Sequence, residues 1–183
     1  MSSGVTGGLI IGRQAEQAAI SAFLDGLSAG PAVLVVEGQA GMGKTTLWRH
    51  AMAQAAGRGY RVLSSRPSEA ETRLSFSGLA DLVGGILEDV DVQLPAPQRN
   101  ALDVALFLAT ASGPPPSQLA VSLAVRGVLS STASGRPILV AVDDAQWMDE
   151  PSASALEFAF RRVASESIGV LATAPRESAE ATP

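Results

Sequence analysis

The sequence contains no cysteine, which excludes disulfide bridges and thiolate metal sites and makes the cytoplasm the expected compartment. It also lacks any apolar run of the roughly 18 to 20 residues that a membrane-spanning helix requires, so we expect no membrane association. The first residues, MSSGVTGG, show no basic region followed by an apolar stretch, and they therefore predict no secretion signal.

Aromatic residues and positive charge are also scarce, at 4% aromatic residues and a formal net charge of −5. Proteins that bind nucleic acid directly usually present a basic face and often aromatic stacking platforms. We therefore expect no direct nucleic-acid binding by this chain. The remaining composition, with 46% apolar and 17% charged residues, fits a single α/β domain over residues 1–183.

Lysine is scarce as well, because twelve arginines accompany a single lysine, Lys44. A sequence so rich in arginine has accepted a guanidinium at every other basic position. An ammonium group is a compact point charge, whereas a guanidinium is a wide planar fork that does not fit a tight phosphate loop. The lone lysine therefore marks a position where a small cation is needed.

Apolar and polar residues alternate with the periods of helices and strands along the chain. Helices are predicted at residues 13–27, from the glycine-rich loop to 57, and at 78–89, 101–109, 118–129 and 157–164. Strands are predicted at 32–36, 60–64, 138–142 and 168–172, and a loop at 130–137. Three strands, at 32–36, 138–142 and 168–172, are continuous apolar runs, a pattern typical of parallel strands buried on both faces. The sequence therefore predicts an α/β fold with a parallel sheet between layers of helices.

A glycine-rich stretch follows the first strand. The pattern GxxxxGK[ST] is matched at every position by Gly38, Gln39, Ala40, Gly41, Met42, Gly43, Lys44 and Thr45. Glycines in such a loop let main-chain N–H groups approach phosphate oxygens, and the helix N-terminus adds partial positive charge. We predict that the loop and the adjacent Thr46 bind a nucleotide, that Lys44 reaches its β- and γ-phosphates, and that Thr45 binds Mg²⁺.

The strand at 138–142 ends in two acids, Asp143 and Asp144. In a P-loop sheet this strand end lies near the loop, so we expect Asp143 to hold Mg²⁺ through water. Asp144 is placed to orient or deprotonate an attacking water molecule. The alternative is that both acids only cap the strand and begin a turn.

Four further segments carry a resemblance to a known family. They are residues 11–16 (IGRQAE), 74–79 (LSFSGL), 94–99 (LPAPQR) and 142–149 (VDDAQWMD). Together with the loop, they resemble the N-terminal ATPase domain of large ATP-binding LuxR-type transcriptional regulators. These regulators belong to the STAND branch of AAA+ ATPases, close to the Orc1-like domains. The resemblance implies a three-layer P-loop NTPase fold of the ASCE/AAA+ type, with ATP and Mg²⁺ as cofactors.

The resemblance also implies roles for residues outside the loop. Gly12 and Arg13 lie in the segment that such proteins place against the adenine and ribose, although Arg13 alternatively only begins a helix. Thr173 stands where the family places a polar γ-phosphate sensor. Asp144 replaces the glutamate of many related ATPases and is one methylene shorter, which favours slow hydrolysis. Trp147 either packs under the acidic segment or contacts the ligand.

The family's strand order places the loop-bearing strand beside the strand at 168–172, with 138–142 next and 60–64 outermost. The sequence ends before the fifth strand, the helical lid and the DNA-binding region of such regulators. We therefore expect a truncated domain whose strand at 32–36 lies at an open edge. That edge would be available to the rest of a larger regulator chain or to self-association.

Three functions follow from these observations. The favoured one is an ATP-binding regulatory module with slow hydrolysis, because Lys44, Thr45 and Asp143 are all present. The second is a stand-alone P-loop ATPase or kinase-like enzyme, for which we find no acceptor-substrate motif. The third is a scaffold that keeps the fold without a nucleotide.

Overall fold

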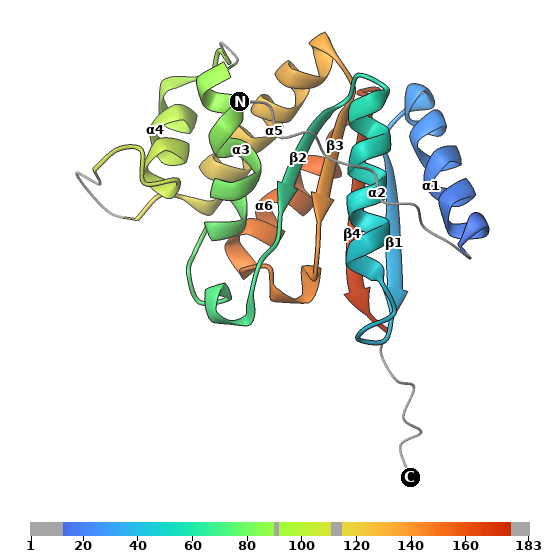
Figure 1. Cartoon of the computed structure of the whole chain (residues 1–183). Coiled ribbons are helices and arrows are strands. Elements are labelled where there is room, and N and C mark those ends of the chain that lie inside the picture. Colours follow the sequence, from blue (N-terminus) through green and yellow to red (C-terminus); the bar gives the residue numbers. More distant parts are fainter. Residues whose placement is uncertain (1–12, 90–91, 111–114, 177–183) are drawn as a thin grey trace, which may run out of the picture.

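The computed structural model describes residues 13–89, 92–110 and 115–176. Its centre is a parallel four-stranded sheet in the order β1-β4-β3-β2. The strands are β1 (Ala32–Gly38), β2 (Arg61–Ser65), β3 (Ile138–Val142) and β4 (Ile168–Pro175). This order confirms the prediction, since β1 lies beside β4 and β2 is outermost (Figure 1). The fold class, a parallel sheet between helices as in P-loop NTPases, is confirmed as well.

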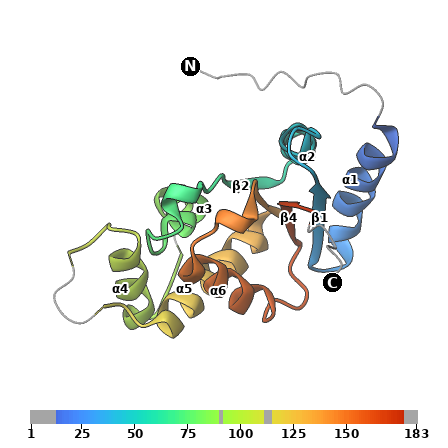
Figure 2. The same ribbon diagram turned by 90° about the horizontal axis from the view of Figure 1, so that it is seen from below.

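Helices form a layer on each side of the sheet. One layer holds α1 (Gln14–Gly26) and α2 (Lys44–Gly57), and the other holds α3 (Ser77–Asp89), α5 (Gln118–Gly135) and α6 (Glu150–Phe160). Figure 2 shows the two layers from below, with α4 (Ala96–Ala105) packed outside α5. The short turns η1 (Leu27–Ala29), η2 (Glu69–Glu71) and η3 (Ala145–Trp147) join these elements. Within the described ranges no helix is both long and apolar enough to span a bilayer.

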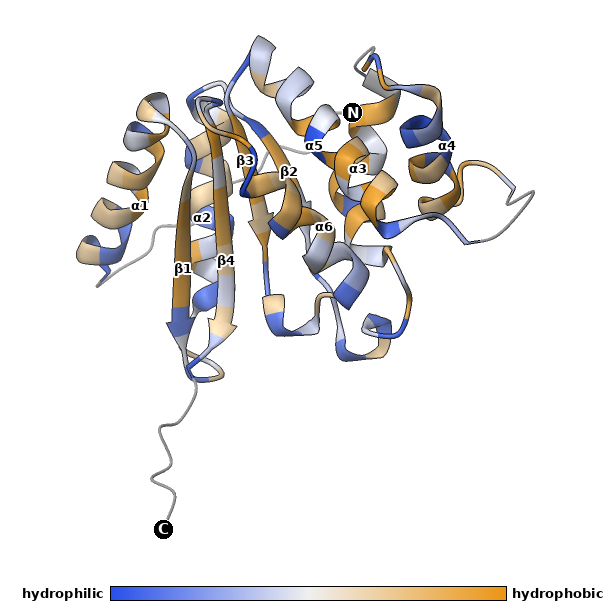
Figure 3. Ribbon diagram, turned by 180° about the vertical axis from the view of Figure 1, so that it is seen from behind, coloured by the Kyte–Doolittle hydropathy of each residue, from blue (hydrophilic) through white to orange (hydrophobic). Residues whose placement is uncertain are grey.

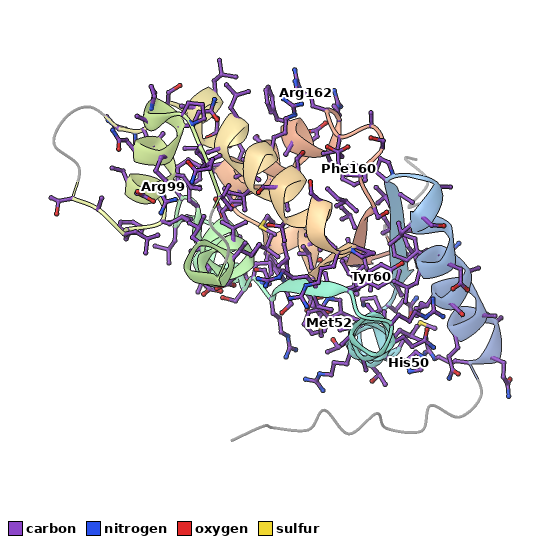
Figure 4. All side chains as sticks on the ribbon, turned by 90° about the horizontal axis from the view of Figure 1, so that it is seen from above. His50, Met52, Tyr60, Arg99, Phe160 and Arg162 are labelled. Atoms are coloured by element: carbon purple, nitrogen blue, oxygen red, sulfur yellow. The ribbon has the colours of Figure 1, made fainter. Side chains whose placement is uncertain are left out.

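Two hydrophobic cores lie on opposite faces of the sheet, because successive strand residues point to opposite sides. Leu139 and Ala141 join the core under α1 and α2, while Ile138, Val140 and Val142 join the core under α3, α5 and α6. All five residues of β3 are buried, as predicted for a strand covered on both faces. Tyr60, just before β2, ties α1 to the sheet, since its hydroxyl donates to the Leu24 carbonyl at 2.6 Å (Figure 4).

Strand β1 is covered on one face only. Leu34 and Val36 pack against the α1–α2 core, but Val33 and Val35 point the other way and are 54% and 49% exposed. The prediction that residues 32–36 are buried on both faces is therefore wrong. The reason is the edge position of β1, where none of the described helices covers the second face (Figure 3). The predicted open edge is present among the described residues.

Helices α1, α2 and α3 match their predictions to within a residue or two at each end, but α5 is longer than predicted. It continues to Gly135, so the prediction of a loop at 130–137 is wrong. The hydroxyls of Thr132 and Ser134 donate to the carbonyls of Val128 and Ser130 one turn earlier, at 2.7 and 3.0 Å. These bonds let residues that usually favour loops remain in the helix.

Helices α4 and α6 begin and end earlier than predicted. Helix α4 covers Ala96–Ala105 rather than 101–109, and Phe107 after it has a φ of 58° and is 85% exposed. Helix α6 covers Glu150–Phe160 rather than 157–164, because the Asp149 carboxylate caps it by accepting the N–H of Ser152 at 3.0 Å. An apolar run alone did not locate these ends, since the N-terminal proline and the cap decide them.

Candidate functional site

The glycine-rich loop joins the carboxyl end of β1 to the amino end of α2. Gly41 and Gly43 have φ values of 78° and 77°, a conformation that residues with a Cβ rarely adopt. The loop is held in a turn by the N–H of Met42, which donates to the Gln39 carbonyl at 3.3 Å. Among the described residues no side chain caps α2, so its first N–H groups remain available to an anion.

Lys44, the first residue of α2, folds back over this loop. Its Nζ donates to the carbonyls of Gly38 at 2.8 Å and Gln39 at 3.2 Å. These two neutral acceptors satisfy the ammonium without fixing it in an ion pair. A phosphate would offer it stronger, charged acceptors at the same loop.

Arg13 lies against the loop from the amino end of α1. Its Nη2 donates to the carbonyl of Met42, and its guanidinium lies 3.9 Å from the Glu16 carboxylate. The structure thus brings Arg13 to the glycine-rich loop across 29 residues of sequence. Gly12, predicted beside it, lies outside the described residues.

The two acids after β3 are joined through one hydroxyl. The Thr173 hydroxyl donates to Asp143 Oδ1 at 2.7 Å and accepts the N–H of Asp144 at 2.8 Å. Asp143 and Thr173 are fully buried. Asp144 has a φ of 53°, a left-handed conformation that Asp and Asn tolerate better than most residues. Thr173 therefore fixes both acids relative to β4.

The second oxygen of Asp143 is in a different environment. Asp143 Oδ2 is buried without a hydrogen-bond partner among the described residues. The Nε of Arg66, which follows β2, lies 3.3 Å from it, within ion-pair distance but outside hydrogen-bond geometry. This buried carboxylate is thus paired with a guanidinium whose side chain is 56% exposed.

A cavity of about 390 Å³ opens between the loop and the acidic segment. Its lining residues come from the loop, the start of α2 and the ends of β3 and β4: Ala40, Gly41, Gly43, Lys44, Thr45, Asp144, Gln146 and Pro175. The structure therefore brings the predicted Lys44, Thr45 and Asp144 to one cavity. The lining does not include seven other predicted residues of the described chain: Gly38, Gln39, Met42, Thr46, Asp143, Thr173 and Arg13. Four of these, Gly38, Gln39, Thr46 and Thr173, are hydrogen-bonded to residues that line the cavity.

Besides Arg66, sequence reasoning missed two residues near this site. Gln146 lines the cavity, and its Nε2 donates to Asp144 Oδ1 at 3.3 Å. Asp149 is buried and accepts the N–H groups of Phe76 at 2.7 Å and Gly78 at 3.0 Å, besides that of Ser152. Both stand in the acidic segment at 142–149, so the segment pointed to them without revealing their contacts.

Burial would raise the pKa of the Asp149 carboxyl. The Ser152 hydroxyl and the N–H groups of Gly78, Ser152 and Phe76 stabilise the charged form more strongly, so the pKa is lowered. Asp149 is therefore ionised at neutral pH and holds the starts of α3 and α6 together.

The donor set at the site is suitable for Mg²⁺ bound with a nucleotide. Nowhere in residues 13–89, 92–110 and 115–176 do three or more His, Asp or Glu side chains cluster as a protein-made metal cage. Mg²⁺ typically takes one or two protein oxygens and completes its shell with phosphates and water. The Thr45 hydroxyl and the unpartnered Oδ2 of Asp143 fit that requirement.

Comparison with known proteins supports the geometry. Residues 9–171 match the family model described as AAA ATPase domain. The chain belongs to this family. No curated protein matches the sequence.

Two solved structures are similar to this member of the AAA ATPase domain family. One is described as a DNA replication initiation factor, at 18% identity and a TM-score of 0.45, covering 91% of this chain and 40% of that one. The other is DnaA from Aquifex aeolicus bound to AMPPCP, at 15% identity and a TM-score of 0.47, covering 92% and 40%. The chain thus spans 40% of the length of these two proteins.

Proposed function

We propose that the chain is an ATP-binding, slowly hydrolysing regulatory module of a signal-responsive LuxR-type transcriptional regulator. The observation that carries the nucleotide part is the single cavity lined by Lys44, Thr45 and Asp144. Its volume of about 390 Å³ lies in the usual range of small-molecule sites. Membership of the AAA ATPase domain family supports the same nucleotide-binding part of the proposal.

Binding begins with the loop. Its N–H groups and the uncapped start of α2 attract the β- and γ-phosphates. Lys44 then exchanges the neutral carbonyls of Gly38 and Gln39 for charged phosphate oxygens, which are stronger acceptors. Thr46 continues this first turn, and Arg13 extends the site towards the nucleoside.

Mg²⁺, when bound, neutralises phosphate charge and polarises the γ-phosphoryl group. Thr45 would supply a hydroxyl to it, and Asp143 would hold it through water with its Oδ2 oxygen. Thr173 keeps Oδ1 of Asp143 occupied and so orients Oδ2. A sensor role for Thr173 would add a response to the γ-phosphate through the same hydroxyl.

Hydrolysis requires a base near the γ-phosphate, and Asp144 is the carboxylate that lines the cavity. Its Oδ1 accepts a hydrogen bond from Gln146, which leaves Oδ2 to accept the proton of water. The short aspartate side chain and this competing bond both favour slow turnover. Slow turnover suits a switch whose nucleotide state must persist.

The regulatory context is supported by the resemblance of residues 11–16, 74–79, 94–99 and 142–149 to LuxR-type regulators. The open edge of β1 supports a role inside a larger assembly, because an unpaired strand edge is a place for another strand to pair. The partner at this edge would be the rest of a larger regulator chain or a second copy.

The test is an equilibrium titration of the purified chain with ATP, with and without Mg²⁺ and with GTP as competitor, followed by steady-state turnover. Tight Mg²⁺-dependent ATP binding with turnover well below roughly 1 to 100 s⁻¹, the range of kinases, supports the switch. Turnover within that range would favour a stand-alone ATPase or kinase-like enzyme instead. Absence of binding would leave a nucleotide-free scaffold.

A further inference from the structure

The two oxygens of the Asp143 carboxylate are held by different partners. Oδ1 accepts the Thr173 hydroxyl at 2.7 Å, whereas Oδ2 is buried without a hydrogen bond among the described residues. A buried carboxylate needs a compensating positive charge, because burial removes its hydration. Within the described part of the chain, Asp143 forms an ion pair with Arg66, whose Nε lies 3.3 Å from Oδ2.

The backbone holds Arg66 in this position. Arg66 directly follows β2, and β2 pairs with β3 in parallel, with Ser65 opposite Val142. The ladder extends one step further, because the N–H of Asp143 donates to the Ser65 carbonyl at 3.1 Å. Arg66 and Asp143 are therefore adjacent by strand register, which does not depend on the side-chain rotamer.

We infer that Arg66 is the counter-cation of Asp143 in the nucleotide-free protein and competes with Mg²⁺ for Oδ2. The inference rests on the proposed function, since it assumes that Mg²⁺ arrives with a nucleotide. Oδ1 already accepts the Thr173 hydroxyl, so Oδ2 is the oxygen with both acceptor sites open to the metal or its bound water, and it is the oxygen that Arg66 faces. A monovalent and a divalent cation at one carboxylate oxygen repel each other, so one displaces the other.

Arg66 is suited to leave. Its side chain is 56% exposed, so the guanidinium can rotate into water while keeping its charge solvated. Asp143 is fully buried and stays in place. Loading the site with Mg²⁺ and a nucleotide therefore breaks the ion pair between Arg66 and Asp143. The segment that leads from β2 to η2 then loses this contact with β3.

The test compares Arg66→Gln with Arg136→Gln. The control removes the same charge from an exposed arginine near the opposite end of the sheet, just before β3. Nucleotide-free Arg66→Gln should melt at a lower temperature than the wild type. With a non-hydrolysable ATP analogue it should need about two- to five-fold less Mg²⁺ for half-saturation, the effect of one partly exposed ion pair. Arg136→Gln should change neither value.

Two further readouts separate the charge from general stability. In an Asp143→Asn background, Arg66→Gln should no longer lower the melting temperature, because the charge it compensated is gone. In the wild type, the ¹⁵N–H signal of Arg66 Nε, assigned by its loss in Arg66→Gln, should shift when Mg²⁺ and the analogue are added together.

An unchanged or raised Mg²⁺ requirement in Arg66→Gln would overturn the inference while leaving the proposed function intact, provided that the wild type binds the analogue. If the wild type does not bind it with or without Mg²⁺, the proposed function fails and the inference fails with it.

Discussion

Asp144 combines an unusual main-chain conformation with a place on the cavity wall. Its φ of 53° disfavours long or branched side chains, and aspartate is among the residues that tolerate this region. The same short carboxylate is the acid that lines the cavity. The main-chain geometry therefore gives one physical reason for an aspartate here, with slower water activation as its consequence.

Asp144→Asn separates these two properties. Asparagine adopts a positive φ as readily and has nearly the same volume, so folding and ATP affinity should stay within about two-fold of the wild type. Turnover should be lost, because an amide cannot accept the proton of water. Paired binding and phosphate-release assays check this, and surviving turnover would assign water activation to another residue.

Residue by residue, the parts of the site that depend on local sequence could be predicted. The loop from Gly38 to Thr45 needs glycines and a small cation at fixed spacing, so its sequence encodes its structure. Arg66 and Asp149 act through contacts with other segments, which no short pattern encodes. Arg13 was predicted from a resemblance, and its contact with Met42 became visible only in the structure.

Asp149 connects two whole helices, α3 and α6. It caps α6 and also accepts the N–H groups of Phe76 and Gly78 at the start of α3. A Cβ at Gly78 would meet the end of the Met148 side chain, which would have to move aside. The acidic segment after β3 is thus attached to the start of α3, which connects the candidate site to the outer helices.

The lowered pKa of Asp149 predicts how stability depends on pH. Its folded-state pKa lies below the unfolded value of about 3.9, so its contribution is complete at neutral pH and is lost as the pH falls through the folded-state value. Asp149→Asn should lower the unfolding free energy by about 1 to 3 kcal/mol at pH 7. It should also reduce the further loss of stability between neutral and acid pH.

Urea unfolding at neutral and acid pH measures both effects. Glu157→Gln is the control, because its ion pair with Arg161 is exposed and should contribute little. An Asp149→Asn variant with the pH dependence of the wild type would contradict the role assigned to this carboxylate.

The positions where helices begin and end were predicted least well from the sequence. In α5 the hydroxyls of Thr132 and Ser134 bond back to the helix, whereas a pattern of Ser, Thr and Gly favours a loop. In α6 the start depends on a cap whose carboxylate also serves α3. Strands were predicted better, because a short, continuous apolar run such as 138–142 fits few structures other than a buried strand.

At the scale of the whole molecule, the described residues form two cores and leave one strand face uncovered. Val33 and Val35 are 54% and 49% exposed on β1, and β1 pairs with a strand on one side only among the described residues. The strand order followed from the family resemblance, and the exposure of this face follows from that order. Composition alone could not reveal it, since an apolar run looks the same at an edge and in the centre.

This surface predicts concentration-dependent association of the 183-residue chain. Val35→Lys should reduce association without changing nucleotide affinity, because a charge on an edge strand opposes pairing. Sedimentation velocity over a range of concentrations measures the effect. Leu119→Lys places the same charge on another exposed apolar residue, on α5, and should leave association unchanged. Equal effects of both variants would indicate nonspecific hydrophobic contact instead.

The central claim is that the loop and its single lysine hold the phosphates of ATP, and Lys44→Ala tests it most directly. Its ATP affinity, measured by calorimetric titration in Mg²⁺, should fall at least about thirty-fold, roughly 2 kcal/mol or more for a lost charge-assisted contact. Arg49→Ala, an exposed change on the same helix, should keep wild-type affinity. Equal ATP affinity in Lys44→Ala and the wild type would contradict the account.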